Sequence, residues 1–246
     1  MDSYKENIEA EVYLWQKEML GKPTIINRLA KKMQTKVNSW IPERIHKAIT
    51  ATIKQMVRAV LFGAKYTTQN PIVETDLSIM EIRITERIKF YRNTAAVEGG
   101  ITGAGGILLG LADFPLLLTI KIKLLFEIAV LYGFNTDDYK ERLYILHIFQ
   151  LAFCSHEERK NVYLKMVDWD EKSKNLPTDI EQFDWRTFQQ EYRDYIDLAK
   201  MAQLIPIIGA PVGLVVNYQL IKKLGATAMN AYRMRLLEGN NKRLEQ

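Results

Sequence analysis

The sequence predicts an all-α protein, and three observations carry that prediction. Apolar residues recur every three or four positions along most of the 246 residues, which is the spacing of a helix with one buried face. No stretch alternates apolar and polar residues in the manner of a half-buried strand. The chain is 48% hydrophobic and 26% charged, as globular proteins are. We therefore expect residues 1–246 to form a single compact multi-helix bundle with a glycine-rich apolar helix pair at its centre.

Proline and glycine mark where the helices of the amino-terminal half begin and end. We expect a first helix over residues 4–20, which Gly21 ends. A second should begin at Pro23 and a third at Pro42, because proline fits the first turn of a helix. A charged amphipathic helix should cover residues 74–98, with its apolar residues at helical spacing facing inward.

The carboxyl-terminal half carries similar signals. An apolar run ends at Gly133, which stands where a helix C-cap is expected, and Asn135 or Thr136 should cap the following helix. A polar connection follows the next two helices. The last helix should begin near Pro211 and run towards Glu238.

Glycines gather in one apolar segment, GGITGAGGILLGLADFP, which covers residues 99–115. On one helix, four of them would share a face that Asp113 continues, because they step by four, three and four residues: Gly99, Gly103, Gly106 and Gly110. A second stripe of small residues comes late in the chain, at Gly209, Gly213 and Asn217. Close approach of two helices would offset the ~0.5–1 kcal/mol that each mid-helix glycine costs. We expect the two stripes to pack together.

Two other interpretations of this glycine segment compete with helix packing. A dinucleotide-binding loop needs G-x-G-x-x-G after a strand, whereas Leu108 takes the third glycine position and a charged helix precedes it. The run from Ile101 to Gly133 is long enough to span a membrane, but Asp113 and Pro115 interrupt it, and a central charge costs ~2.5–3.5 kcal/mol. A shallow or re-entrant hairpin stays open beside a helix buried in the protein.

Carboxylates near the glycines form a candidate polar site. Asp113 is a candidate functional group, with Glu98 and Glu127 as companions that would bind a cation or a proton. In the alternative, Asp113 accepts backbone N–H groups where Pro115 interrupts the helix. Asn217 has a comparable structural alternative, as a core amide that bonds backbone groups across a tight helix contact.

Basic residues are concentrated towards the amino terminus, where residues 22–65 contain ten lysines and arginines and Glu43 as the one acid. On the second and third expected helices they form stripes away from the apolar face: Arg28, Lys32 and Lys36, then Lys47, Lys54, Arg58 and Lys65. Such stripes suit an anionic lipid surface or an acidic membrane partner. A solvated face without a ligand is the alternative. We do not expect nucleic acid, because no recognition module is visible.

Motifs for catalysis or metal binding are not recognisable. His147, Cys154 and His156 are neighbours in sequence but lack a paired spacing such as C-x2-C or H-E-x-x-H. We therefore expect neither a cofactor nor a metal. Cys154 is the one cysteine, and the polar amino terminus does not resemble a signal peptide, so we expect a cytoplasmic protein.

Five segments form a distinctive combination: YLWQKEML, LAKKMQTKVNSWIPERIHKAI, EGGITGAGGILLGLADFP, LYGFN and IPIIGAPVGLVVN. A glycine block ending in D-x-P and a late P-x-x-G-x-x-x-G-x-x-x-N resemble the EcsC family over nearly the whole chain. The matching positions are Gly103, Gly106, Asp113, Pro115, Gly209, Gly213 and Asn217. Similar proteins of Gram-positive bacteria are encoded beside the ATPase and membrane subunits of the Ecs ABC transporter, which is implicated in protein secretion and intramembrane proteolysis. The resemblance implies that neighbourhood and no catalytic residue.

Together these features predict a non-enzymatic, cytoplasmic accessory protein at the inner membrane surface. The resemblance implies that it is associated with an Ecs-type ABC transporter linked to protein secretion. Its partners would be an anionic membrane surface or subunits of a membrane transporter. The alternative is a metal- or small-ligand-dependent enzyme built around the carboxylates of Glu98, Asp113 and Glu127.

Overall fold

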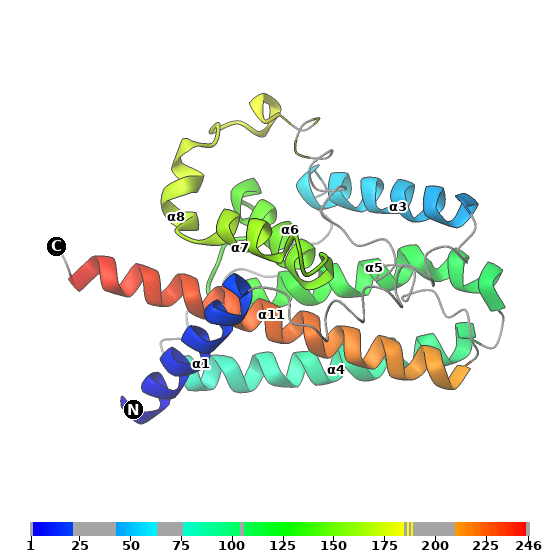
Figure 1. The fold of residues 1–246 in the computed structure, drawn as a ribbon, viewed down its shortest axis with the longest axis horizontal. Helices are drawn as coiled ribbons and strands as arrows, with labels where there is room; N and C mark the ends of the chain where they lie inside the picture. The colour runs from blue at the N-terminus through cyan, green and yellow to red at the C-terminus, as the bar shows by residue number, and fades with distance from the viewer. Residues whose placement is uncertain are drawn as a thin grey trace.

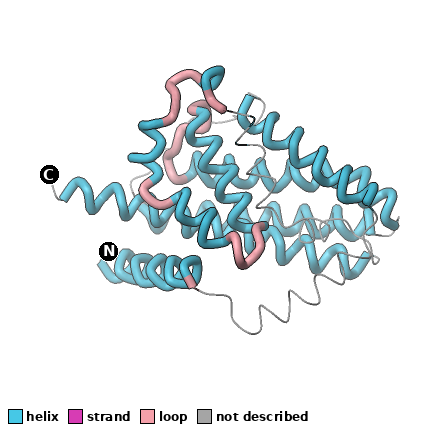
Figure 2. The backbone as a smooth tube through the Cα atoms, turned by 45° about the horizontal axis from the view of Figure 1, so that its top comes forward, coloured by secondary structure: helices cyan, strands magenta, loops and turns pink. Residues whose placement is uncertain are grey.

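The protein is built from helices that run beside one another. The computed structural model describes residues 2–21, 43–62, 76–103, 106–184, 186, 188 and 210–244. Within these residues the chain folds into helices joined by turns and loops, with no β-strand (Figure 2). This confirms the all-α prediction. The division of residues 1–246 into a single domain stays a prediction.

Helix α5 (Gly106–Leu131) lies at the centre of the molecule (Figure 1). It contacts α3 (Glu43–Phe62), α4 (Leu77–Gly103), α6 (Tyr139–Phe153) and α11 (Ala210–Leu244). The apolar run predicted from the sequence supplies its buried side chains, among them Leu118, Leu124 and Ile128, each 1% exposed or less. Most of the described apolar side chains of α5 are therefore covered by other helices of the same chain, and Leu116, at 48% exposed, is an exception.

Helices α4 and α11 pack along much of their length (Figure 1). Gly225 of α11 faces Ile88 of α4, and a Cβ atom at Gly225 would lie 2.7 Å from Ile88 Cδ1 and 2.8 Å from Ile88 Cγ1. Carbon atoms do not approach that closely, so the two backbones meet at a distance that a glycine permits. Gly225 lies outside both glycine stripes predicted from the sequence.

Helix α1 (Asp2–Leu20) lies on the outside of the bundle, against α11 and α7 (Arg159–Met166). One face of α1 is buried and carries Ile8, Val12, Trp15 and Met19. The Trp15 ring meets the Tyr163 ring edge-on at 5.7 Å between centroids. The predicted end of this helix at Gly21 is confirmed.

The turn after α5 was predicted correctly at its start and wrongly at its end. Gly133 has a φ of 85°, and the Phe134 N–H donates to the Ala129 carbonyl at 3.0 Å, which is the backbone pattern of a glycine C-cap. Neither Asn135 nor Thr136 caps α6. Asp138 does so instead, accepting from the Lys140 N–H at 2.9 Å, because it stands immediately before the first turn.

A loop-rich segment follows α7 and contains α8 (Trp169–Lys172), η2 (Ser173–Asn175) and η3 (Ile180–Gln182). The sequence predicts this region as a polar connection. Trp169 anchors it, since its side chain is buried with its ring centroid 5.5 Å from that of Tyr144. α8 thereby covers one side of α6.

Candidate functional site

Three exposed cations mark the outward face of α3. Lys47, Lys54 and Arg58 are all exposed, and their spacing of seven and four residues places them on one side of the helix. After Glu43 the helix contains no acidic residue. The opposite side is core, where Ile49, Ile53 and Val60 are 2% exposed or less. Val57 and Leu61 are buried to the same degree. We call the three cations the basic face of α3.

The basic face is fixed in position by its neighbours. Arg142 of α6 donates through Nη1 to the Leu61 carbonyl at 2.9 Å, which satisfies a carbonyl in the last turn of α3. The same guanidinium donates to the carbonyls of Thr136 and Asp137 at 2.8 Å each. The apolar side of α3 is thus committed to the core, and its basic side faces solvent.

Four other residues of the predicted basic stripes lie outside the described part of the chain: Arg28, Lys32, Lys36 and Lys65.

A buried lysine lies at the contact between α5 and α11. The Lys121 side chain is 0% exposed, and its Nζ donates to the Leu117 carbonyl at 3.4 Å and to Asn217 Oδ1 at 3.5 Å. Asn217 is 1% exposed. Asn217 is a candidate site residue in the sequence, with a core amide as the alternative, and its burial beside Lys121 is the arrangement found. The sequence does not predict this charged partner, because local spacing does not show which residue a lysine faces.

Glu127 binds groups of the neighbouring helix. It accepts from Arg87 Nε at 2.6 Å and from the Tyr91 hydroxyl at 2.5 Å, both on α4. The carboxylate therefore joins α4 to α5 by an ion pair and a hydrogen bond. The side chains of Glu98 and Asp113, its predicted companions, lie outside the described part of the structure.

The glycine segment is divided between two helices. α4 ends at Gly103 and α5 begins at Gly106, so the prediction that the glycines share one helix face is wrong. Glycine lowers helix stability, and a cluster of glycines favours a break. Gly110 lies in α5 and Gly213 in α11, while Gly209 is outside the described residues.

Pro115 lies inside α5 and does not interrupt it, contrary to expectation. Its fixed φ of about −65° is helical, so a proline removes one hydrogen bond without necessarily ending a helix. Its side chain is exposed.

Two arginines near the end of α11 organise buried polar clusters that the sequence analysis missed. Arg233 meets Glu81 of α4 at two positions, Nε to Oε1 at 2.7 Å and Nη2 to Oε2 at 2.5 Å. Glu81 also accepts from the hydroxyls of Tyr4 at 2.7 Å and Tyr132 at 3.2 Å. Arg233 Nη1 reaches Glu11 of α1 at 2.7 Å. This first cluster joins α1, α4 and α11 with the turn after α5.

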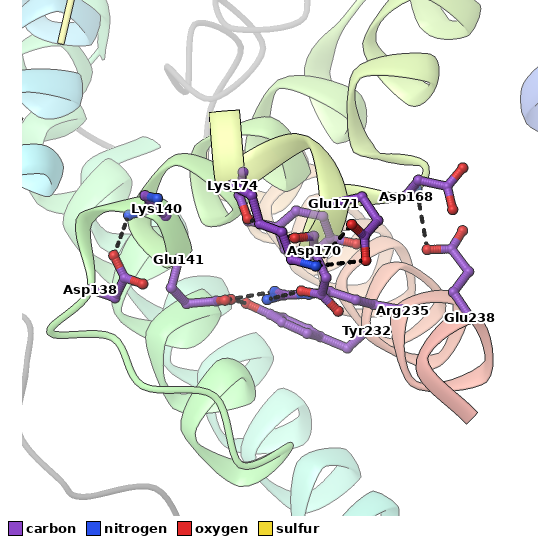
Figure 3. Close-up of polar contacts among 12 residues, drawn as sticks. Asp138, Lys140, Glu141, Asp168, Asp170, Glu171, Lys174, Tyr232, Arg235 and Glu238 are labelled. Carbon is purple, nitrogen blue, oxygen red and sulfur yellow. Dashed lines mark hydrogen bonds and ion pairs between the residues drawn. The ribbon is translucent and has the colours of Figure 1, made fainter. Parts of the chain in front are cut away.

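The second cluster surrounds Arg235 (Figure 3). Its Nη1 donates to Glu141 Oε2 of α6 at 2.6 Å, and its Nε donates to Asp170 Oδ1 of α8 at 2.8 Å. The Tyr232 hydroxyl donates to Glu141 Oε1 at 2.7 Å. The guanidinium carbon also lies 4.1 Å from the Phe134 ring centroid, a cation–π distance. Charge, hydrogen bonding and packing thus coincide at one arginine.

Burial shifts the pKa values of one carboxyl and of several tyrosines in these clusters. It raises the pKa of the Glu141 carboxyl above its ordinary value of 4.5, while Arg235 and Tyr232 oppose that shift by stabilising the carboxylate. Burial also raises the pKa values of Tyr132 and Tyr232 well above 10.0. Burial and the hydrogen bond to Glu81 raise the pKa of Tyr4 to about 12. The tyrosines are therefore neutral donors at physiological pH.

The histidine and cysteine side chains near α6 bond to nearby groups. His147 Nδ1 lies 3.2 Å from Gln150 Oε1, and the Cys154 thiol donates to the Leu151 carbonyl at 3.3 Å. In the part of the chain that the structure describes, no three His, Cys, Asp or Glu side chains are grouped so that they could hold a metal ion. Over the same part, no helix combines the length and apolar character needed to cross a membrane.

Comparison with known proteins agrees with the family motifs. The model of the EcsC protein family matches residues 6–237. Protein EcsC of Bacillus subtilis (strain 168) is 42% identical over 229 residues, which cover 93% of this chain and 94% of that protein. A second protein of that organism, described as the uncharacterized protein YdbA, is 27% identical over 245 residues, with 94% and 88% covered. No solved structure matches the chain. The motifs, the helical architecture and the extent of these matches show that the chain belongs to the EcsC protein family.

Proposed function

We propose that this protein is a cytoplasmic accessory protein of the cell membrane, which binds the anionic membrane surface beside an Ecs-type ABC transporter linked to protein secretion. The basic face of α3 is the observation that carries the proposal. The family resemblance supports the association with the transporter, because it implies that the protein and the transporter subunits are produced together.

The basic face supports adsorption to lipid without insertion. Its three cations face solvent and the apolar side of α3 is buried, so attraction to lipid headgroups is the main force that α3 offers. Each basic residue near an anionic membrane contributes about 1 kcal/mol, and three together contribute on the order of a hundredfold in affinity. Such attraction is screened by salt over a Debye length of ~8 Å at physiological ionic strength.

Flotation of the purified protein with liposomes tests this proposal. We expect binding to phosphatidylglycerol vesicles, little binding to phosphatidylcholine vesicles, and a loss of binding as salt is raised. The triple change Lys47→Glu, Lys54→Glu and Arg58→Glu should abolish binding without lowering the unfolding midpoint, because all three side chains are exposed.

A matched control carries the same change in net charge elsewhere. Lys89, Lys160 and Lys222 are exposed residues of α4, α7 and α11, and replacing all three by Glu should leave most of the binding intact. Equal binding to both kinds of vesicle, or equal losses in the two triple variants, would contradict the proposal.

A crosslinking experiment separates lipid from a transporter subunit as the partner of α3. Ala51 is exposed and lies between Lys47 and Lys54 on the helix. A photoreactive residue at Ala51 should crosslink to lipid when the face rests on the membrane, and to a transporter subunit when that subunit covers it. A crosslink to neither, in cells that contain the transporter, would contradict the proposal.

A further inference from the structure

The outward face of α1 has the residue spacing of a helix-packing seam. Opposite its buried face lie exposed residues that step by four, three, four and three positions: Glu6, Ala10, Tyr13, Lys17 and Leu20. This is the 3.5-residue repeat of helices that pack against another helix. Tyr13 is 64% exposed and Leu20 45%, and Leu14 at the edge of the stripe is 64% exposed. We call Glu6, Ala10, Tyr13, Lys17 and Leu20 the outer stripe of α1.

Charge and size along the outer stripe are self-complementary. An antiparallel second copy of α1 that brings Lys17 opposite Glu6 also brings Tyr13 opposite Ala10, because both pairs are centred between residues 11 and 12. A single two-fold axis therefore generates each pair twice. In one pair the large Tyr13 side chain meets the small Ala10, and in the other the Lys17 cation meets the Glu6 anion. The stripe fits another copy of itself in this one register.

The two charged residues of the outer stripe form no ion pair within the described structure, as is also true of Lys5 and Glu9 of α1. On the flanks of α1, Glu11 pairs with Arg233 and Glu18 pairs with Arg159. Neither Glu6 nor Lys17 pairs with any described residue. No described helix covers the outward side of α1 (Figure 2). A second copy has both access to the stripe and a charge to match.

We propose that two copies of the protein associate through the outer stripe of α1, as an antiparallel and two-fold symmetric helix pair. Lys17 of each copy pairs with Glu6 of the other, and Tyr13 of each packs on Ala10 of the other. A single pair of helices buries less than the ~800 Å² per partner of an ordinary stable interface, so the association is reversible and depends on protein concentration. The proposal does not rest on lipid binding.

Sedimentation of the full chain over a concentration series tests it. The molar mass should rise from 28.6 kDa towards twice that value as concentration increases. Glu6→Lys alone and Lys17→Glu alone each create two like-charge pairs across the axis, and we expect each to weaken the dimer about tenfold or more. The double exchange, Glu6→Lys with Lys17→Glu, should restore it.

Mixing the two single variants distinguishes a lost dimer contact from a loss of folding, because an unfolded variant would not regain association. An equimolar mixture of the two single variants should form a heterodimer, because each contact across the axis then joins a lysine to a glutamate. Lys5→Glu changes charge on α1 outside the stripe and should leave the dimer unchanged. A mass that stays at 28.6 kDa throughout, a dimer insensitive to the single changes, or variants that neither the double exchange nor mixing rescues would each overturn the proposal.

Discussion

Arg233 and Arg235 stand two positions apart on α11, and a helix turns about 100° per residue. Their guanidinium groups therefore leave the helix on nearly opposite sides, Arg233 towards Glu81 and Arg235 towards Glu141. The Arg233, Arg235, Glu81 and Glu141 side chains are each 10% exposed or less, and both carboxylates also accept tyrosine hydroxyls. Removing one partner from such a buried pair leaves an uncompensated charge, which costs more than losing the pair at the surface.

Glu141→Gln tests this difference against a matched change on the same arginine. Gln keeps the size and can still accept from Tyr232, but it leaves Arg235 with Asp170, which is 51% exposed. We expect a loss near the lower end of the ~3–5 kcal/mol typical of a broken buried ion pair. Asp170→Asn should cost less than about 1 kcal/mol because that partner is at the surface. Urea unfolding measures both, and equal losses would contradict this account.

At the scale of elements, Gly225 marks a close contact between α4 and α11 that lies outside the two predicted glycine stripes. Gly225 lets α11 approach Ile88 of α4, ahead of the two arginines on the same helix. A methyl group at this position would have to displace Ile88, whose branched Cβ leaves it few rotamers. The close packing of α4 and α11 therefore offsets the loss of helix stability that the glycine causes.

Two glycine-to-alanine changes in α11 should have opposite effects. Gly225→Ala would overpack the α4 contact and should destabilise by ~1–3 kcal/mol. Gly239→Ala meets no atom within 4 Å and should stabilise by up to about 1 kcal/mol through helix propensity alone. Thermal or urea unfolding measures the pair. A Gly225→Ala variant at least as stable as the parent would show that the two helices are not in tight contact.

At the scale of the whole molecule, buried tyrosines join helices that are distant in sequence. The rings of Tyr132 and Tyr232 stack at 5.5 Å, and the Tyr144 hydroxyl donates to the Ala231 carbonyl at 2.9 Å. Burial raises the pKa values of all three above 10.0. These residues keep their protons in the folded state at a pH where the unfolded chain has lost them.

Stability should therefore fall as pH rises above 10.0, the ordinary tyrosine pKa, because the unfolded state then binds fewer protons than the folded state. Below that pH the tyrosines are protonated in both states and contribute no pH dependence. We expect tyrosinate absorbance from the buried residues to appear together with the loss of helical circular dichroism. Tyr13→Phe, at an exposed position, should not move this transition. Tyrosinate formation from the buried residues while helix content stays intact would contradict the assignment.

The apolar periodicity and the glycines and prolines at helix ends predicted the helices well, because these signals are local in sequence. Gly21 and Gly133 end helices as expected, and the inward residues of α3 are buried. The break in the glycine segment was missed because spacing alone does not say whether glycines strengthen a contact or end a helix. That the stripes of Gly106 and Gly213 pack together stays a prediction.

The polar clusters were beyond sequence reasoning for a different reason. Glu81 and Arg233 are 152 residues apart, and the local sequence pattern of each helix does not predict which residue its charge will contact. A weak signal was available, since each lies at an inward position of its helix, where a charge needs a buried partner. Lys121 gave the same signal inside its apolar run. Which of these residues form pairs can be predicted only when the arrangement of the helices is known.

The place of Arg233 in the chain has a consequence for synthesis. It lies 222 residues after Glu11 and 152 residues after Glu81 in the chain. At ~5–20 residues per second the ribosome needs on the order of ten to fifty seconds to add the residues between Glu11 and Arg233. Until Arg233 has been added, α1 lacks α11, one of the two helices that it packs against, and the Glu81 carboxylate lacks its counter-ion. The first helix can thus complete its packing only after the residues of α11 have been made.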